Sequence, residues 1–169
     1  MLREDTVTDD GRCAVMEFTV FGWNGKVWED PAHLSCRSGL ECFSGGHLHV
    51  IDEIVSPEFE FHYPNMPSGL EGLKAIVRKN NDTFTDWSFK IHQLLAEGDR
   101  VVAQWSATGI HAKSFLGEPP TQKKVKLKGI SIYQIKDDKI YKDWVEPDNL
   151  DFLTQLGMLE FVDFTKKKN

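Results

Sequence analysis

The stretch that decides the fold runs from residue 109 to residue 157 and reads GIHAKSFLGEPPTQKKVKLKGISIYQIKDDKIYKDWVEPDNLDFLTQLG. Its first part carries the glycine, prolines and threonine of 117–121, which are residue types that mark turns. Two segments rich in β-branched and aromatic residues follow, at 123–135 and 139–146, and we predict that both are strands. A short helix is predicted at 149–156. The stretch therefore indicates a β-hairpin followed by a helix.

The segments before this stretch add more strands and several helices. Strands are predicted at 88–96 and 100–112, joined by a tight turn at Glu97-Gly98-Asp99. The earlier predicted elements are helices from Pro31 to about Phe43, from His47 to Val55 and from Gly69 to Asn80, and a strand from Glu58 to Tyr63. Helices that precede a run of antiparallel strands indicate an α+β fold.

The N-terminal part carries a separate apolar feature. Residues 18–28 read as a β-hairpin around Asn24-Gly25, a dipeptide that accepts positive φ at both turn positions. Its phenylalanine and tryptophan side chains are too apolar to stay in water, so we expect the hairpin to cover the domain or a partner subunit. At the other end, the basic tail at 161–169 is expected to be solvated.

The composition excludes several classes of protein. The chain has 169 residues, enough for one domain with a core, and a net charge of −6 that argues against a nucleic-acid binder. No apolar run approaches the about 20 residues that a membrane helix needs. Three cysteines are too few and too irregular for a disulfide scaffold. We expect a soluble cytoplasmic protein without nucleic-acid or membrane partners.

Several short motifs follow one another along residues 40–157. They are Asp52-Glu53-x-Val55-x-Pro57, Gly69-Leu70-x-Gly72, Glu97-Gly98-Asp99, Gly117-x-Pro119-Pro120-Thr121, Lys139-Ile140, Trp144, Asp148 and Gln155-Leu156-Gly157. In this order and spacing the chain resembles the SnoaL-like polyketide cyclase family, which shares its fold with ketosteroid isomerases. The resemblance implies a curved antiparallel sheet wrapped with helices into a cone, which we assign to residues 31–160, with 1–30 as an extension.

The resemblance also implies a function. Members hold a hydrophobic or polycyclic ligand in a deep apolar cone, often as homodimers. They catalyse cyclisation, isomerisation, dehydration or epoxide opening by acid/base chemistry, without a metal or cofactor. For this chain we expect no cofactor and no metal; His47 and His49 project to different faces of a short helix, which argues against a metal site there.

Alternation along 124–135 identifies the inner face of the sheet. Successive strand side chains point to opposite faces, and the even positions begin with three lysines, which belong in water. The odd positions therefore face inward, and they include Ser131 and Tyr133. Both hydroxyls could be satisfied core groups or ligand-binding groups. Beyond Gly129 the even face is apolar too, which suggests that a second subunit covers it.

The next strand depends on the length of its turn. A three-residue loop at 137–139 places Tyr141, Asp143 and Val145 on the inner face, whereas a two-residue loop would turn Lys142 and Trp144 inward. A lysine buried in an apolar cone is costly, which favours the first register. Asp143 is then a carboxyl in an apolar cavity, where desolvation raises its pKa toward values suited to proton transfer. The alternative is an exposed Asp143 balanced by Lys142.

The chain departs from the family at two positions. The founding cyclases use a histidine and an aspartate on these two strands, and the matching positions here hold Ser131 and Val145. Neither residue can act as the expected base. We therefore predict that the acid/base role has moved to Asp143, with Tyr133 as its cross-strand neighbour.

Two histidines complete the candidate site. His111 shares a face with Trp105, a possible stacking wall, and His62 could point inward or lie outside while Phe61 and its neighbours line the cone. The predicted catalytic residues are Asp143, Tyr133, His111 and His62. The predicted substrate-binding residues are Ser131, Trp105, Phe61, Tyr141, Val145 and Phe115.

Two functions remain open at this point. The first is a cofactor-independent cyclase, isomerase or dehydratase, acting on a hydrophobic polyketide- or terpenoid-like molecule as a homodimer. The second is a non-catalytic module in which the cone binds a ligand or another protein. An Asp143 enclosed beside Tyr133 would favour the enzyme, and an exposed Asp143 would favour the binding module.

Overall fold

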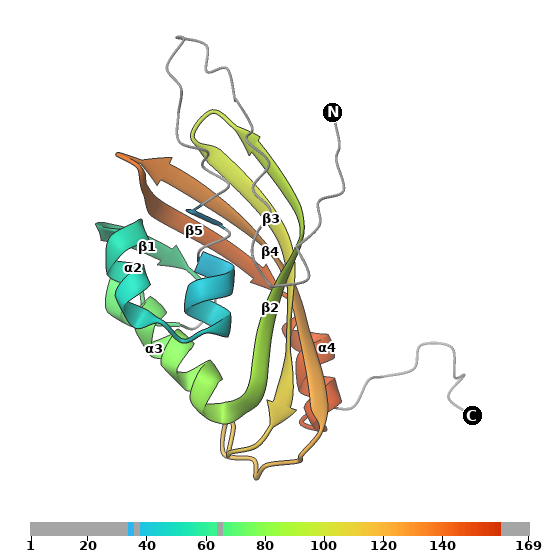
Figure 1. Ribbon diagram of the computed structural model, residues 1–169. Helices are drawn as coiled ribbons and strands as arrows, with labels where there is room; N and C mark the ends of the chain where they lie inside the picture. Colours follow the sequence, from blue (N-terminus) through green and yellow to red (C-terminus); the bar gives the residue numbers. More distant parts are fainter. Residues whose placement is uncertain (1–33, 36–37, 64–65, 160–169) are drawn as a thin grey trace, which may run out of the picture.

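The computed structural model describes residues 34–35, 38–63 and 66–159 (Figure 1). The predicted hairpin at 18–28 and the basic tail lie outside these residues. The described elements, in chain order, are the π-helical segment η1 (Ser38–Ser44), α2 (Leu48–Ile54), β1 (Val55–His62), α3 (Gly69–Thr83), β2 (Phe84–Glu97), β3 (Arg100–His111), β4 (Lys124–Lys136), β5 (Lys139–Pro147) and α4 (Asn149–Leu156). Helices gathered around one five-stranded sheet confirm the α+β prediction.

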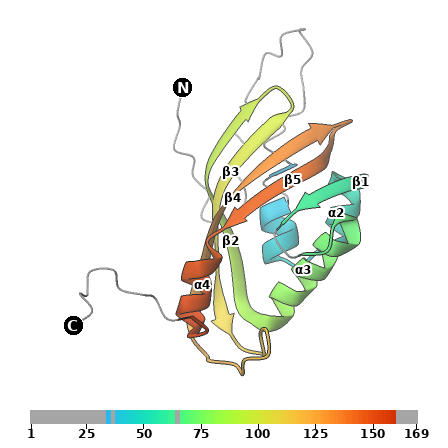
Figure 2. The same cartoon turned by 180° about the vertical axis from the view of Figure 1, so that it is seen from behind.

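The sheet is a curved meander with one added strand. Its order is β1-β5-β4-β3-β2, in which β2 to β5 pair antiparallel and β1 joins the edge of β5 in parallel. Helices α2 and α3 lie on the concave side of the sheet (Figures 1 and 2). The sheet stays open, because β1 and β2 form its two edges and do not pair with each other. The core therefore lies between the concave face and the helices.

Helix α4 lies against the edge of β4 beyond the point where β5 ends. The last pair between the two strands is Gly129 with Pro147. Beyond it, the side chain of Gln155 bonds to both the N–H and the C=O of Lys126, each at 2.8 Å. Asp148 caps the helix by accepting a hydrogen bond from the N–H of Asp151 at 3.1 Å. In Figure 2 the helix accordingly lies beside the lower part of the sheet.

Several predicted boundaries were wrong. β1 begins at Val55, three residues before the predicted start at Glu58, so Pro57 lies within the strand. β1 is an edge strand whose register shifts between Val55 and Glu60, and such positions tolerate proline. Helix α3 continues to Thr83, beyond the predicted end at Asn80, and β2 follows it directly.

The turn between β4 and β5 has two residues, so the predicted three-residue loop was wrong. Asp137 and Asp138 have φ values of 52° and 57°, as a tight hairpin turn requires, and aspartate tolerates that conformation. A bulge then restores the predicted inner face. Ile135 pairs with Ile140 but Gln134 pairs with Lys142, which leaves Tyr141 as an extra residue.

The bulge places Asp143 and Val145 on the buried face, each 5% exposed, and moves Tyr141 off it. Tyr141 is half-buried, with the ammonium groups of Lys136 and Lys142 at 5.0 and 5.3 Å from its ring centroid. The predicted inward orientation of Tyr141 was therefore wrong, because the extra residue reverses the alternation at that point.

The predicted faces of β4 are confirmed. Ser131 and Tyr133 are buried at 2% and 4%, while the three even-numbered lysines are exposed. On the same outer face, Ile130 and Ile132 are 47% and 40% exposed in the single chain. Among the described helices, none is long and apolar enough to cross a membrane.

Candidate active site

A cavity of about 390 Å³ lies between the concave face of the sheet and helix α3. Most of its lining is aromatic or aliphatic, and the described lining residues that carry polar groups are Tyr63, Lys79, Asn80, Trp87, Trp105, Ser131, Tyr133, Asp143 and Asn149. Exposed lining residues, among them Met66 and Leu116 at 38% and 65%, mark its opening. The shape is that of an apolar pocket with a few placed polar groups, which is typical of small-molecule sites.

Strand pairing brings the innermost polar groups together. Tyr133 on β4 lies directly opposite Asp143 on β5, and Ser131 lies opposite Val145. Such cross-strand neighbours have Cβ atoms about 5 Å apart. Trp105 reaches the same place from β3. The predicted neighbourhood of Asp143 and Tyr133 is therefore present in the fold.

Asp143 is a buried carboxyl with a free oxygen. Burial raises its pKa well above the usual value, and a hydrogen bond from Ser131 opposes that shift. The Oδ1 atom is buried and has no hydrogen-bond partner among the described residues. An unsatisfied buried polar atom is costly and calls for an explanation, which a ligand group would provide. Desolvation thus favours the protonated form of this carboxyl, and in that form Asp143 can donate a hydrogen bond into the cavity.

Trp105 fixes the direction of the Ser131 hydroxyl. The indole Nε1–H donates to Ser131 Oγ at 3.1 Å. Because the indole nitrogen can only donate, Ser131 accepts from Trp105 and keeps its own hydrogen for Asp143. The hydrogen bonds run from Trp105 through Ser131 to Asp143.

Gly129 makes this arrangement possible. A Cβ atom at position 129 would lie 2.5 Å from Cζ2 of Trp105, a distance that real contacts do not reach. The missing side chain therefore leaves the space in which the indole lies. Gly129 is opposite Trp105 in the register of β3 and β4.

A second polar pair lies on the cavity wall. The Tyr63 hydroxyl donates to Oδ1 of Asn149 at 3.4 Å, and both residues line the cavity. Burial raises the pKa of the Tyr63 phenol, and its bond to Asn149 opposes the shift. The phenol therefore stays neutral over the physiological range.

His111 does not reach the cavity. It is fully buried against the rings of Phe84 and Phe115, at centroid distances of 5.6 and 6.3 Å, and is not part of the cavity lining. Its Nδ1 accepts from the backbone N–H of Thr121 at 3.2 Å, while its backbone bonds to Gln122 and Lys123. This position contradicts a direct contact with a ligand and shows that His111 holds the turn after β3.

His62 lies on the outer face of β1. Its ring stacks on Trp144 at 5.1 Å with an interplanar angle of 5°, and its Nε2 is 3.4 Å from a carboxylate oxygen of Glu60. The predicted catalytic placement of His62 was therefore wrong, because the alternation of β1 sends Phe61 into the cavity and His62 to the opposite side.

Seven of the ten predicted site residues line the cavity. They are Asp143, Tyr133, Ser131, Trp105, Phe61, Val145 and Phe115. The sequence reasoning missed Lys79 and Asn149. Lys79 could have been found from the spacing of helix α3, because Ile76, Lys79 and Asn80 lie three and four residues apart and so share one face.

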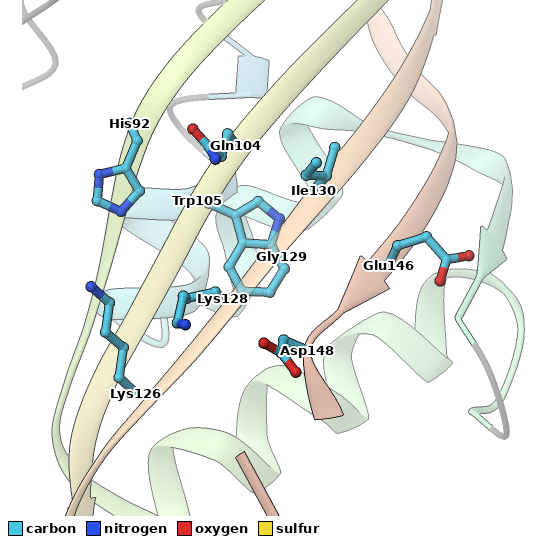
Figure 3. Close-up of a pocket in the computed structure, with 9 residues that line it drawn as sticks. All are labelled: His92, Gln104, Trp105, Lys126, Lys128, Gly129, Ile130, Glu146 and Asp148. Atoms are coloured by element: carbon cyan, nitrogen blue, oxygen red, sulfur yellow. The ribbon is translucent and has the colours of Figure 1, made fainter. Parts of the chain in front are cut away.

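A second hollow, of about 370 Å³, lies on the outer face of the sheet (Figure 3). Trp105 and Gly129 form its floor, with His92, Lys126 and Lys128 on one side and Glu146 and Asp148 on the other. Burial lowers the pKa of His92, and the charges of Lys126 and Lys90 lower it further. Trp105 thus lines both the inner cavity and the outer hollow.

The described residues offer no metal site. No group of three or more histidine, cysteine, aspartate or glutamate side chains is placed to hold an ion in this part of the chain.

Comparison with known proteins identifies the family. The SnoaL-like polyketide cyclase profile matches residues 35–156. The chain belongs to this family. None of the curated proteins matches the sequence. The family assignment confirms the resemblance that the ordered motifs predicted.

Several solved structures have the same fold as this chain. TsrD from Streptomyces laurentii is 27% identical, with a TM-score of 0.72 over 79% of this chain and 100% of TsrD. A provisionally assigned polyketide cyclase from Bacillus cereus is 30% identical, with a TM-score of 0.67 over 77% of this chain and 82% of that protein. Another from Acidithiobacillus ferrooxidans is 26% identical, with a TM-score of 0.67 over 78% and 98%. Proteins from several bacteria thus share the fold of this chain.

Proposed function

We propose that this SnoaL-like protein is a cofactor-independent acid/base enzyme that moves a proton on a hydrophobic small molecule. The observation that carries the proposal is the buried carboxyl of Asp143, which lines an apolar cavity and whose Oδ1 has no partner among the described residues. A catalytic acid or base needs a pKa near the working pH, and desolvation raises the pKa of this carboxyl in that direction.

The residues around Asp143 suit proton transfer beside a carbonyl group. Ionised Asp143 takes a proton from the carbon next to the carbonyl, and the C–H electron pair passes into the enolate. The neutral carboxyl then returns the proton to another carbon, or to a leaving oxygen in a dehydration. Tyr133, opposite Asp143, can donate its phenol hydrogen to the enolate oxygen. No oxidant or reductant is needed.

The substrate class follows from the cavity and the family. The cavity has a volume of about 390 Å³ and mainly aromatic and aliphatic walls, which suit a bicyclic or similar apolar ligand. We propose a polyketide- or terpenoid-like molecule in natural-product biosynthesis, and a cyclisation, isomerisation or dehydration as the reaction. A cytoplasmic location remains a prediction.

The test measures proton exchange directly. In D₂O, wild-type protein should catalyse exchange of the α-hydrogens of 2-tetralone, followed by NMR, and Asp143→Asn should lower the rate by about 100-fold or more. Asp138→Asn is the matched control, because Asp138 lies in the exposed turn between β4 and β5. Equal rates for wild type and Asp143→Asn would refute the proposal and leave ligand binding without catalysis as the function of the cavity.

We also propose a homodimer that uses the outer face of the sheet. Exposed Ile130 and Ile132 lie there, and the outer hollow carries basic residues on one side and acidic residues on the other. A twofold axis through this face would set the basic side of one copy against the acidic side of the next. Analytical ultracentrifugation should give the mass of two chains, and that of one chain for Ile130→Glu; a monomeric wild type would refute this.

A further inference from the structure

The charged groups of the cavity are arranged unevenly. Among the described lining residues, Lys79 is the only cation and Asp143 the only carboxyl. They lie on different elements: Asp143 is buried on β5, whereas Lys79 is exposed near the end of α3. Among these lining residues the cation is therefore exposed at the opening, and the carboxyl is buried away from it.

Lys79 is held at the opening by an aromatic contact. Its Nζ lies 5.4 Å from the ring centroid of Phe115, which also lines the cavity. A cation over a ring face is weakly attracted, and this contact keeps the ammonium beside the opening. Phe115 in turn pairs with Glu118 across the tight turn that carries the exposed Leu116.

No carboxylate neutralises Lys79 within the described part of the chain. The nearest acidic residue along α3 is Asp82, and Asp82 pairs with Lys113 instead. By contrast, Lys74 on the same helix is paired with both Asp52 and Glu71. An unpaired ammonium beside an apolar cavity can bind an anionic group from a ligand.

From this arrangement we propose that Lys79 binds an anionic oxygen group, such as a carboxylate, on a ligand whose apolar body fills the cavity. The inference rests on the proposed function, because it assumes that the cavity is the ligand site. Asn80, the next lining residue, can add an amide hydrogen bond.

A ligand bound in this way has a fixed orientation in the cavity. The acidic end stays at the partly hydrated opening with Lys79, and the reacting carbonyl lies next to Asp143. The chain as a whole carries a net charge of −6, so general electrostatic attraction does not favour anions. Any preference for an anionic ligand must therefore come from a local group, and Lys79 is the lining cation available for it.

The test compares two ligands of one shape. Naphthalene-2-carboxylate and naphthalene-2-carboxamide differ in charge but hardly in size, and binding of each is measured by calorimetry at pH 7. Wild-type protein should prefer the carboxylate, and Lys79→Gln should lower the ratio of the two affinities by about fivefold, which corresponds to about 1 kcal/mol. Lys79→Glu should lower it further.

Arg78→Gln is the matched control. Arg78 is the preceding residue on α3, is exposed and does not line the cavity, so the same loss of charge should leave the ratio unchanged. An unchanged ratio in Lys79→Gln, or an equal loss in Arg78→Gln, would overturn the role of Lys79. Equal binding of both ligands by wild type would overturn it too, yet leave proton transfer by Asp143 intact. Binding of neither ligand would count against both proposals.

Discussion

Replacement of Gly129 by alanine tests the packing behind Asp143. The backbone of Gly129 lies outside the positive-φ region, so alanine is allowed there by conformation. The new methyl group, however, would lie 2.5, 2.9 and 2.9 Å from Cζ2, Cε2 and Cη2 of Trp105. The indole must move, and its 3.1 Å hydrogen bond to Ser131 must lengthen or break. Gly129→Ala should therefore destabilise the fold through Trp105.

Three contributions set the size of this effect. Overpacking of a filled core costs about 1–3 kcal/mol, and a lost hydrogen bond costs about 1 kcal/mol. Alanine also restricts the unfolded chain, which stabilises by about 0.4–1 kcal/mol. The free energy of unfolding should thus fall by about 2 kcal/mol, and the Tm by about 4–8 °C for a chain of this length.

A double-mutant cycle separates the contact from other effects. Urea unfolding is measured for wild type, Gly129→Ala, Trp105→Phe and the double variant. Phenylalanine lacks the part of the indole that the new methyl group meets, so Gly129→Ala should cost less than about 1 kcal/mol in the Trp105→Phe background. The same cost in both backgrounds would show that the indole is not the reason, and would refute the proposed geometry.

Two further predictions concern charge and the cap of α4. Burial raises the pKa of Asp143, so the unfolded chain loses this proton at lower pH than the folded chain. The contribution of Asp143 to the free energy of unfolding is fully present below about pH 4, and it declines as the pH rises toward the pKa of Asp143 in the folded chain. The urea midpoint of wild type should therefore fall relative to that of Asp143→Asn between pH 4 and pH 7; a constant difference would contradict the shift. Asp148→Ala should lower the free energy of unfolding by about 1 kcal/mol, whereas Asp148→Asn keeps an acceptor for the N–H of Asp151. Equal losses in the two variants would argue against the cap.

The alternation of side chains along β4 predicted the inner face of the sheet, because its lysines must face the solvent. The polar even positions of β4 fixed Ser131 and Tyr133 as inward, and burial agrees. On β1 the sequence offers no such marker, since His62 and Phe61 could each point inward. The orientation there depends on pairing with β5, which brings Phe61 opposite Asp143. Pairing between distant segments is not visible in a local pattern.

The site residues that were missed or misplaced depend on tertiary contacts. The spacing of α3 puts Lys79 on the same face as Ile76, but the fact that this face meets the cavity depends on tertiary packing, in which Lys79 lies over the ring of Phe115. His111 lies on the same face of β3 as Trp105, but the strand continues past the cavity, so the His111 ring packs against Phe84 instead. Alternation along a strand predicts which face a side chain lies on, but whether that part of the strand reaches the cavity depends on the whole fold.

The two-residue turn and the bulge at Tyr141 have a consequence for comparing relatives. The turn is one residue shorter than expected, and the bulge adds one residue to β5, so the two changes compensate. A relative could therefore lose the extra residue by deletion and keep the same inner face beyond it. Counting residues across this hairpin would then misalign the two sites by one position. Equivalent site residues in this family should be matched by strand pairing with β4, even where that introduces a gap in the alignment.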